Sequence, residues 1–264
     1  MESIKLLSLN IGNPSLTRAV RQCEWLSKRD EDVFVLTETK NSQGCSYIED
    51  FFLNQCHTLF DQDSKIEYDV RFPRSVTGDL GVMIICKHRI VDTRYIFENN
   101  SIYYSRQLES SVQYNNMALN IMGLYVPSRD RTEKKIQRKK NFIDDIIKNI
   151  NTSAKSTSII MGDLNILDQK HFPHYSTFYK WEYDFYDDII KCGYKDAYRI
   201  CNPTTNDYSW IGRTGDGYRY DYCFVSDDLI QNVISCSFDH ETRNLKLTDH
   251  SAITIELVFN KINK

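Results

Sequence analysis

Ile160-Met161-Gly162-Asp163-Leu164-Asn165 joins an apolar run to a glycine and then to two side chains that carry oxygen. The apolar run has the composition of a buried strand, so Asp163 and Asn165 stand just past a strand end. Alternate residues of an extended chain point to the same side, so both side chains can reach one object. A carboxylate and an amide oxygen suit a hard cation such as Mg²⁺. Taken alone, however, Asp-x-Asn after a strand is more often a turn whose side chains bond the local backbone.

Three further segments place polar side chains at the ends of predicted strands. These strands are expected at about 4–10, 33–38 and 251–258. The side chains at their ends are Asn10, Glu38 and the pair Asp249 and His250. Each could be an ordinary strand terminus. Together they are typical of the active sites that layered α/β folds place at strand ends.

Six motifs follow one another in a characteristic order. They are Leu9-Asn10-Ile11-Gly12, Leu36-Thr37-Glu38-Thr39-Lys40, Leu124-Tyr125-Val126-Pro127, Gly162-Asp163-Leu164-Asn165, Tyr220-Asp221-Tyr222-Cys223-Phe224-Val225-Ser226 and Thr248-Asp249-His250. In order and spacing they resemble the motifs of the endonuclease/exonuclease/phosphatase superfamily over residues 4–257. The chain is most similar to its exonuclease III and apurinic/apyrimidinic endonuclease branch, because other branches usually carry a histidine motif at the position of Tyr125-Val126-Pro127. Residues 78–85 and 208–221 are also similar to that branch.

Two positions depart from the pattern of this branch. Gly12 stands where the repair enzymes usually place Asp or Asn, so one water-mediated metal contact is expected to be missing or to come from Asn13. Ser128 stands where they usually place Asn, and its hydroxyl donates a hydrogen bond but reaches less far. Metal binding is expected to survive both changes, whereas both bear on the choice of substrate.

The resemblance implies an α/β fold, a four-layered sandwich of two face-to-face mixed, mainly antiparallel sheets flanked by helices. Irregular alternation of strand and helix signals also suits a mixed sheet better than a Rossmann fold. Helices are expected at about 16–29, 134–150 and 183–192, and further strands at about 81–86, 118–125, 157–162 and 220–225. We expect one domain over residues 1–264, because the motifs come from both ends of the chain and no Gly/Ser- or Pro-rich linker divides it.

The resemblance also implies a metal centre for phosphodiester hydrolysis. Glu38 is expected to bind the metal directly, with Asn10, Asp249 and Asp163 close to it. The expected ion is Mg²⁺, for which Mn²⁺ can substitute, and the same residues could serve one ion or two. Asp163 is the expected general base, and Asn165 is expected to bind the nucleophile or a phosphate oxygen.

Three more residues receive catalytic roles from the same resemblance. His250, when protonated, would bind a non-bridging phosphate oxygen. Asp221 would orient the ring of His250 and raise its pKa, as a neighbouring carboxylate does. Tyr125 would donate a hydrogen bond to the charge that develops during the reaction.

Substrate contacts are expected from aromatic and basic side chains around this centre. They are Trp210, Tyr218, Arg219, Ser128, Arg131 and Arg74. The two aromatic side chains could stack on a base or an abasic sugar, or could pack under a loop. Residues 129–140 contain seven positive charges at the start of a helical apolar pattern, including Lys134, Lys135 and Lys139. These charges are expected on the outer face, either as a solvated surface or as a rim that binds nucleic acid.

Composition fits a soluble protein with a substantial core, since 41% of its 264 residues are apolar and 26% are charged. A net charge of −3 argues mildly against a coat protein for nucleic acids. The sequence shows no secretion signal and no run near the ~18 apolar residues that span a bilayer. We therefore expect a cytoplasmic protein, or a nuclear one in a eukaryote. Eight cysteines without a Cys-x-x-Cys pair predict reduced thiols, buried at Cys86 and Cys223.

The expected function is a Mg²⁺-dependent phosphodiesterase acting on DNA. It would be an apurinic/apyrimidinic endonuclease or a 3′–5′ exonuclease that leaves 3′-hydroxyl and 5′-phosphate ends. The expected partner is duplex DNA, no membrane is involved, and the expected state is a monomer. One alternative keeps the metal chemistry but acts on RNA, an inositol phosphate or a phospholipid head group. A non-catalytic binding module is a second alternative, against which the presence of every expected metal and phosphate residue except the one replaced by Gly12 argues.

Overall fold

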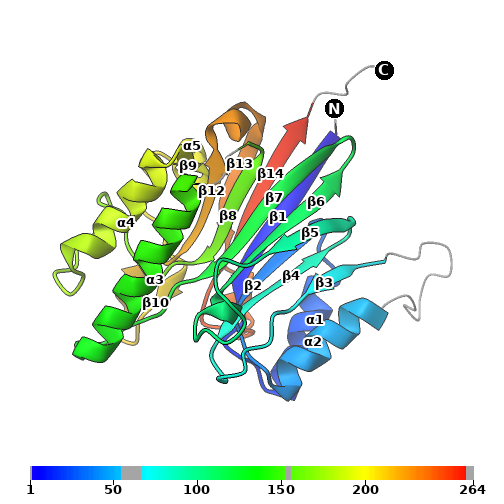
Figure 1. Cartoon of the computed structure of the whole chain (residues 1–264), viewed down its shortest axis with the longest axis horizontal. Coiled ribbons are helices and arrows are strands. Elements are labelled where there is room, and N and C mark those ends of the chain that lie inside the picture. The colour runs from blue at the N-terminus through cyan, green and yellow to red at the C-terminus, as the bar shows by residue number, and fades with distance from the viewer. Residues whose placement is uncertain (1, 55–66, 153–155, 260–264) are drawn as a thin grey trace.

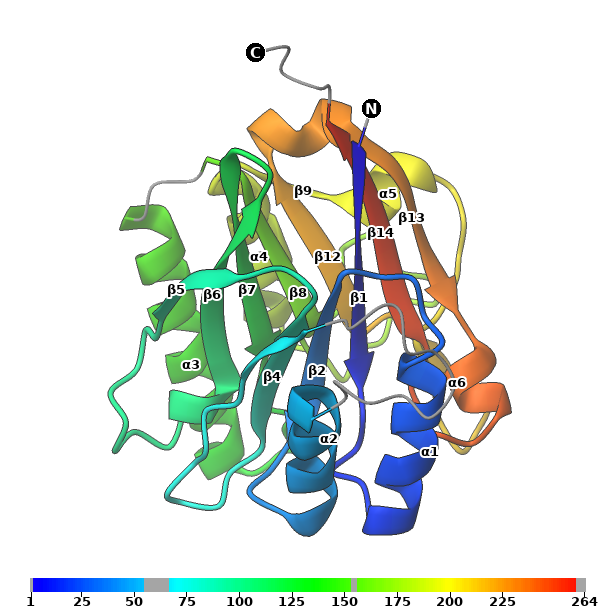
Figure 2. The ribbon, with the colours of Figure 1, turned by 90° about the vertical axis from the view of Figure 1, so that its right-hand side faces the viewer.

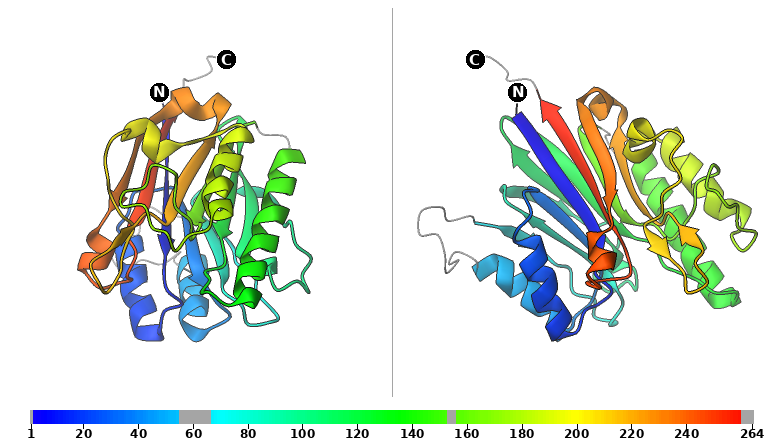
Figure 3. Two further views of the ribbon diagram at one scale, coloured as in Figure 1. Left: turned by 90° about the vertical axis from the view of Figure 1, so that its left-hand side faces the viewer. Right: turned by 180° about the vertical axis from the view of Figure 1, so that it is seen from behind.

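Two six-stranded sheets pack face to face, and helices cover the outer face of each sheet (Figure 1). The computed structural model describes residues 2–54, 67–152 and 156–259. The right-hand view of Figure 3 shows the layers in order, as a helix pair, a sheet, the second sheet and another helix pair. The predicted four-layered α/β sandwich is therefore confirmed.

The first sheet has the strand order β13-β14-β1-β2-β4-β3. Its strands are β13 (Val233–Asp239), β14 (Ala252–Phe259), β1 (Glu2–Asn10), β2 (Val33–Thr39), β4 (Gly81–Cys86) and β3 (Asp69–Arg71). β1 and β2 run parallel, and the other neighbouring pairs are antiparallel. Because side chains alternate along β1, Ile4 and Leu6 face the second sheet while Leu7 and Leu9 face the helices.

The second sheet has the strand order β5-β6-β7-β8-β12-β9. Its strands are β5 (Ile90–Arg94), β6 (Gln107–Tyr114), β7 (Met117–Tyr125), β8 (Ser158–Asp163), β12 (Asp221–Ser226) and β9 (Tyr194–Asp196). Here β7 and β8 are the parallel pair, and the other neighbours are antiparallel. A separate two-stranded hairpin consists of β10 (Trp210–Ile211) and β11 (Gly217–Tyr218).

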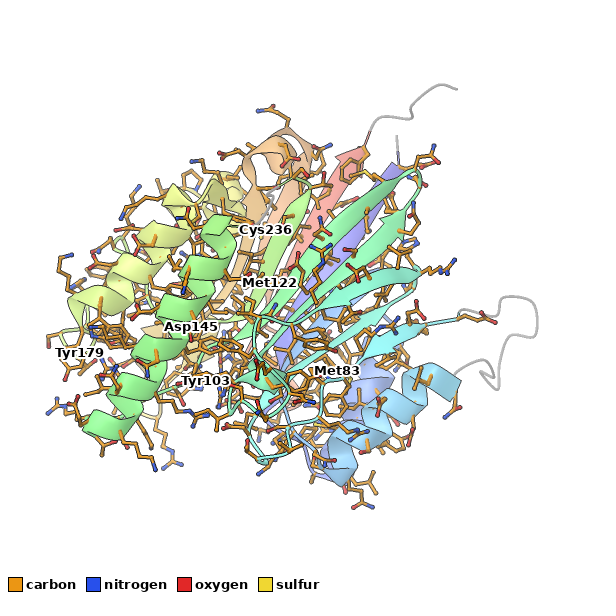
Figure 4. The ribbon with its side chains drawn as sticks, in the orientation of Figure 1. Met83, Tyr103, Met122, Asp145, Tyr179 and Cys236 are labelled. Carbon is orange, nitrogen blue, oxygen red and sulfur yellow. The ribbon has the colours of Figure 1, made fainter. Side chains whose placement is uncertain are left out.

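Helices α1 and α2 pack on the first sheet, and α3 and α4 pack on the second. The helices are α1 (Leu16–Leu26), α2 (Gln43–Asn54), α3 (Glu133–Thr152), α4 (Lys180–Lys191), α5 (Ala197–Cys201) and α6 (Glu241–Asn244), with 3₁₀ turns η1 (Tyr104–Arg106) and η2 (Asp227–Asn232). Met83 and Met122, labelled in Figure 4, point from the two sheets into these two helix layers. No helix in the described part of the chain is long and apolar enough to cross a membrane.

The predicted elements are present, with small differences at their ends. The helix predicted over 16–29 ends at Leu26, where the backbone N–H of Ser27 caps the last turn. The helix predicted over 183–192 begins earlier, at Lys180, because the side chain of Glu182 caps the preceding turn. The predictions omitted α2, α5, α6, β6, the edge strands and the hairpin of β10 and β11.

The cysteines of the described residues carry free thiols. Cys86 and Cys223 are buried between the sheets, as predicted. Burial raises the pKa of the Cys86 thiol to about 12, so this side chain behaves as a small apolar group. Cys56 lies outside the described residues.

Chain direction places the motif residues at one end of the sandwich. β1 ends at Asn10, β7 ends at Tyr125 and β8 ends at Asp163, all at this end. β12 and β14 run antiparallel to their neighbours β8 and β1, so both strands begin there. In Figure 2 this end lies opposite the two chain termini. The strand order thus brings side chains from distant parts of the sequence to one edge.

Candidate active site

A hydrogen bond between the two sheets lies at the centre of this edge. The amide nitrogen Nδ2 of Asn10, at the end of β1, donates to Oδ2 of Asp163 at 2.8 Å. Both side chains are almost fully buried. Oδ1 of Asn10 accepts a hydrogen bond from the backbone N–H of Gly12, which fixes the orientation of the amide. The first and the fourth motif of the sequence therefore meet directly.

The turn after β8 is built around two unusual backbone conformations. Gly162 has a φ of +145°, and a Cβ atom there would lie 1.9 Å from the carbonyl oxygen of Leu124, so only glycine fits. Asn165 has a φ of +50°, a region that asparagine tolerates better than most residues. Its backbone N–H donates to Oδ1 of Asp163 at 2.9 Å. Asp163 therefore accepts a hydrogen bond within the local turn and also contacts Asn10 of the other sheet, so the two interpretations of this motif are both correct.

Asp163 is a buried carboxyl group in a strongly negative environment. Burial, followed by the negative charge of Asp221, raises its pKa to about 8. The charge of Glu38 acts in the same direction, whereas the positive charge of His250 and the hydrogen bond from Asn10 oppose it. A carboxyl group in this state can exchange a proton near neutral pH.

His250 and Asp221 form a buried pair beside Asp163. Nδ1 of His250 lies 2.7 Å from Oδ2 of Asp221. Burial disfavours the charged ring, but the charge of Asp221 and its hydrogen bond outweigh this and raise the pKa of His250 to about 9. The ring is therefore a cation at neutral pH, with Nδ1–H donating to Asp221. Nε2–H is then the donor left for a ligand in the cavity that His250 lines.

Glu38 occupies a strained position at the end of β2. Its φ is +55°, and Oε1 accepts a hydrogen bond from the hydroxyl of Tyr125 at 2.8 Å. Burial and the charge of Glu38 raise the pKa of Tyr125, so its hydroxyl remains a donor. Among the described residues, no group donates a hydrogen bond to Oε2 of Glu38, so this oxygen remains available to a metal or a water.

Asp249 faces the same cavity from the segment before β14. Its Oδ2 accepts a hydrogen bond from the indole nitrogen of Trp210 at 2.8 Å. Burial acts to raise the pKa of Asp249, but this bond and the charge of His250 prevail and lower it. Asp249 is consequently a carboxylate throughout the neutral range.

The donor set fits a hard divalent cation. Glu38, Asp163 and Asp249 bring carboxylates to one cavity. Burial and the negative charges of Asp221 and Glu38 raise the pKa of Asp163, and a cation would offset these charges. One oxygen each of Asp163 and Asp221 and a ring nitrogen of His250 also lie within 4.8 Å of one another. We interpret that second group as a hydrogen-bonded unit, because a protonated imidazole has no lone pair for a metal.

Asn13 does not replace the side chain that is missing at Gly12. Its Oδ1 accepts a hydrogen bond from the hydroxyl of Ser42 at 2.9 Å, away from Asn10. Gly12 itself has a φ of +62°, and its carbonyl oxygen accepts a hydrogen bond from Arg18. Beside Gly12 there is therefore a guanidinium group in place of the expected Asp or Asn side chain.

A cavity of about 420 Å³ extends from these residues. One wall is aromatic and consists of Trp210, Tyr218 and Tyr220. The rings of Tyr218 and Tyr220 stack with centroids 5.1 Å apart, and Trp210 lies 5.8 Å from Tyr220. Ser128 lines the cavity as well, whereas Arg74 and Arg131 lie outside it. The aromatic wall therefore adjoins Asp163 and His250 in one space.

The prediction that Arg219 contacts substrate is wrong. This side chain is 1% exposed and forms ion pairs with Asp168 at 2.6 Å and Asp196 at 2.7 Å. The charge of a buried guanidinium requires such partners, so Arg219 is held in the interior by these two carboxylates. The prediction that Lys139 lies on an exposed basic rim is also wrong. Its side chain is buried and forms an ion pair with Glu182 at 2.6 Å.

The sequence reasoning missed several residues that line the cavity. They are Thr177, Phe178, Glu182 and Tyr220, whereas Arg129, which belongs to the predicted basic rim, lines the cavity too. The alternation of Tyr218 and Tyr220 before β12 was a usable signal, because it places two rings on the same side of an extended segment. For Thr177, Phe178 and Glu182 the sequence offers no comparable signal, since packing of α4 against α3 brings them to the cavity.

The profile of the Endonuclease/Exonuclease/phosphatase family matches residues 7–250. The chain therefore belongs to this family, as the six motifs predict. At the level of the family this confirms the prediction of a metal-dependent phosphodiester hydrolase. No curated protein sequence matches the chain.

Three solved structures share the fold over nearly their whole length. An AP endonuclease from Archaeoglobus fulgidus has a TM-score of 0.77 and 19% identity, with 97% of this chain and 99% of that chain covered. A variant of the 3′ phosphatase NExo from Neisseria, bound to a product DNA hairpin, has a TM-score of 0.76 and 18% identity, with 97% and 100% covered. The 3′-5′ exonuclease NExo from Neisseria meningitidis gives the same values.

Proposed function

We propose that this protein is a Mg²⁺-dependent phosphodiesterase that acts on duplex DNA as a monomer. It would serve as an apurinic/apyrimidinic endonuclease or a 3′–5′ exonuclease and leave 3′-hydroxyl and 5′-phosphate ends. The observation that carries this proposal is the shared cavity, in which Asp163 and His250 adjoin the wall of Trp210, Tyr218 and Tyr220. Aromatic faces bind bases and sugars by stacking, which small head groups do not need.

The residues divide the work of hydrolysis between them. Asp163 would take a proton from the attacking water, and its hydrogen bonds to Asn10 and Asn165 hold both carboxylate oxygens in place. His250 would donate from Nε2 to a non-bridging phosphate oxygen and stabilise the charge that develops there. Asp221 keeps the ring in the required orientation.

A divalent cation would be held by Glu38 and Asp249, with Asn10 beside them. When bound, it supplies positive charge for the phosphate and the leaving oxygen. Mg²⁺ suits this oxygen-rich set, and Mn²⁺ is the expected substitute. Tyr125 holds Glu38 by its hydroxyl, so its first role is to orient the main metal ligand.

Fold relatives support the choice of DNA within the family. One of the three similar structures is an AP endonuclease, and another holds a product DNA hairpin. On the surface of this chain, Arg131, Lys134, Lys135 and Lys140 are exposed at the beginning of α3 and just before it. These side chains could contact the phosphate backbone outside the cavity.

A panel of labelled substrates tests the proposal. It contains a duplex with one abasic site, a duplex with a recessed 3′ end, single-stranded DNA, RNA and an inositol polyphosphate, each with Mg²⁺ and with chelator. We expect Mg²⁺-dependent cutting of one or both duplexes. Release of phosphate from the inositol compound, with every DNA left intact, would overturn the proposal.

A further inference from the structure

Lys139 is a buried cation at the edge of the cavity, where it contacts the turn that carries Asp163. Its side chain is 1% exposed, although its neighbours Lys134, Lys135 and Lys140 on α3 are exposed. Nζ donates to the carbonyl oxygen of Asn165 at 2.6 Å and to Oε1 of Glu182 at 2.6 Å. An ammonium group is rarely buried in this way unless each contact is specific.

The carbonyl of Asn165 belongs to the turn that carries Asp163. Its left-handed backbone is fixed at three polar groups. The N–H donates to Asp163, Nδ2 donates to the carbonyl of Val126 at 3.1 Å, and the carbonyl accepts from Lys139. Within the described residues, Lys139 is the only partner of that carbonyl, so the third restraint depends on this side chain.

Glu182 holds Lys139 in position from α4. Its Oε2 accepts hydrogen bonds from Arg129 and from the backbone N–H of Tyr179, which Figure 4 labels at the N-terminal end of α4. Burial acts to raise the pKa of Glu182, but the charge of Lys139 prevails and lowers it. Lys139 is thus clamped between α4 and the turn after β8.

We propose that Lys139 is a positioning residue for hydrolysis, which holds the Asn165 turn and thereby the carboxyl group of Asp163. The proposal for Lys139 rests on the proposed function in one respect, because the assay follows cleavage of a phosphodiester. A displacement of the base by about 1 Å can lower turnover by ~10²-fold, whereas binding of the substrate elsewhere is unchanged. The consequence is a loss in kcat with little change in KM.

The test compares Lys139→Met with two controls on the same helix layer. Ile146→Ala removes a fully buried apolar side chain two turns further along α3, so it lowers Tm but removes no hydrogen bond from the turn. Lys191→Met removes a 71% exposed lysine at the end of α4 that is paired with Asp188. Lys139→Arg retains a charged donor at the position. The measurements are kcat, KM, Tm and NMR hydrogen exchange of the Asn165 amide.

We expect Lys139→Met to lower kcat by ten- to hundredfold and to accelerate exchange of the Asn165 amide. Lys139→Arg should recover part of both losses, and Ile146→Ala should lower Tm with kcat retained. A Lys139→Met protein with a reduced Tm but unchanged kcat and Asn165 exchange would overturn the proposal. If the wild-type protein cuts no DNA, the proposed function fails, while the exchange measurement still decides whether Lys139 holds the turn.

Discussion

The direction of the Glu38 carboxylate is set by its backbone conformation and by a hydrogen bond from Tyr125. Its positive φ at the end of β2 and the hydrogen bond from Tyr125 restrict the carboxylate to one direction. Because ligand oxygens must be held in place before an ion arrives, such restriction favours metal binding. The strain at Glu38 is therefore consistent with a function that outweighs its local cost.

Replacement of Glu38 with alanine should weaken binding of Mg²⁺ or Mn²⁺ by about 10²-fold or more, because it removes the proposed main ligand. Isothermal titration calorimetry with Mn²⁺ measures this loss directly, and circular dichroism checks the fold. Tyr125→Phe is the matched control, since it removes only the hydrogen bond to Oε1 and should weaken binding less. Equal metal affinity in the wild-type and Glu38→Ala proteins would contradict the assigned ligand.

His250 and Asp221 should behave as one unit. Asp221 acts through the ring of His250, so His250→Asn and Asp221→Asn should each lower kcat, and the double variant should be little worse than the first alone. Single-turnover rates of the four proteins form the required cycle. Additive losses would show that Asp221 acts on something other than His250.

At the scale of elements, α3 combines two kinds of positive charge. Lys139 and Arg138 point inward to Glu182 and Asp79, while Lys134, Lys135 and Lys140 remain exposed. Charge density in the sequence cannot distinguish the two kinds, because the partners come from other elements. The inward charges stabilise the packing, and the exposed charges are the candidates for contact with a nucleic acid.

Removal of exposed charge from α3 should flatten the salt dependence of DNA binding. The double variant Lys134→Met and Lys140→Met should reduce the slope of log K against log salt by up to about one unit per contact removed. Fluorescence anisotropy at several salt concentrations measures the slope. Lys191→Met on α4 serves as the control, and an equal change in that variant would exclude a local contact of α3.

The elements that carry motifs could be predicted because their strands are mainly apolar segments that end in Asn10, Glu38 or Asp163. The inward orientation of Arg219 could not be predicted from the sequence, because its partners Asp168 and Asp196 lie elsewhere in the chain. The aromatic wall was predicted in part, through Trp210 and Tyr218. Its closure by Phe178 depends on how α4 packs, which no local pattern determines.

At the scale of the whole molecule, the buried charges link stability to pH. The pKa of His250 is raised from 6.5 to about 9 and that of Asp163 from 3.8 to about 8. Both groups therefore bind protons more tightly in the folded state. Below the unfolded pKa of His250 its contribution is fully present, and it is lost as pH rises through about 9.

The metal-free protein should therefore lose stability as pH rises from about 6.5 to 9. The shift of His250 alone contributes on the order of 3 kcal/mol to this loss, and Asp163 adds to it up to about pH 8. Urea unfolding in chelator at pH 6.5, 8 and 9.5 measures it. The variant His250→Asn should show a weaker decline, and a wild-type protein whose stability is constant over this range would contradict the buried cation.

The bond between Asn10 and Asp163 joins two sheets whose contacting residues lie 153 positions apart in the chain. Neither sheet contains a complete catalytic centre, since each supplies only some of its side chains. A refolding protein can therefore form the regular strands of one sheet and still have no catalytic activity. We expect regained catalysis during refolding to lag behind recovery of the circular dichroism signal, so that turnover reports the final docking of the two halves.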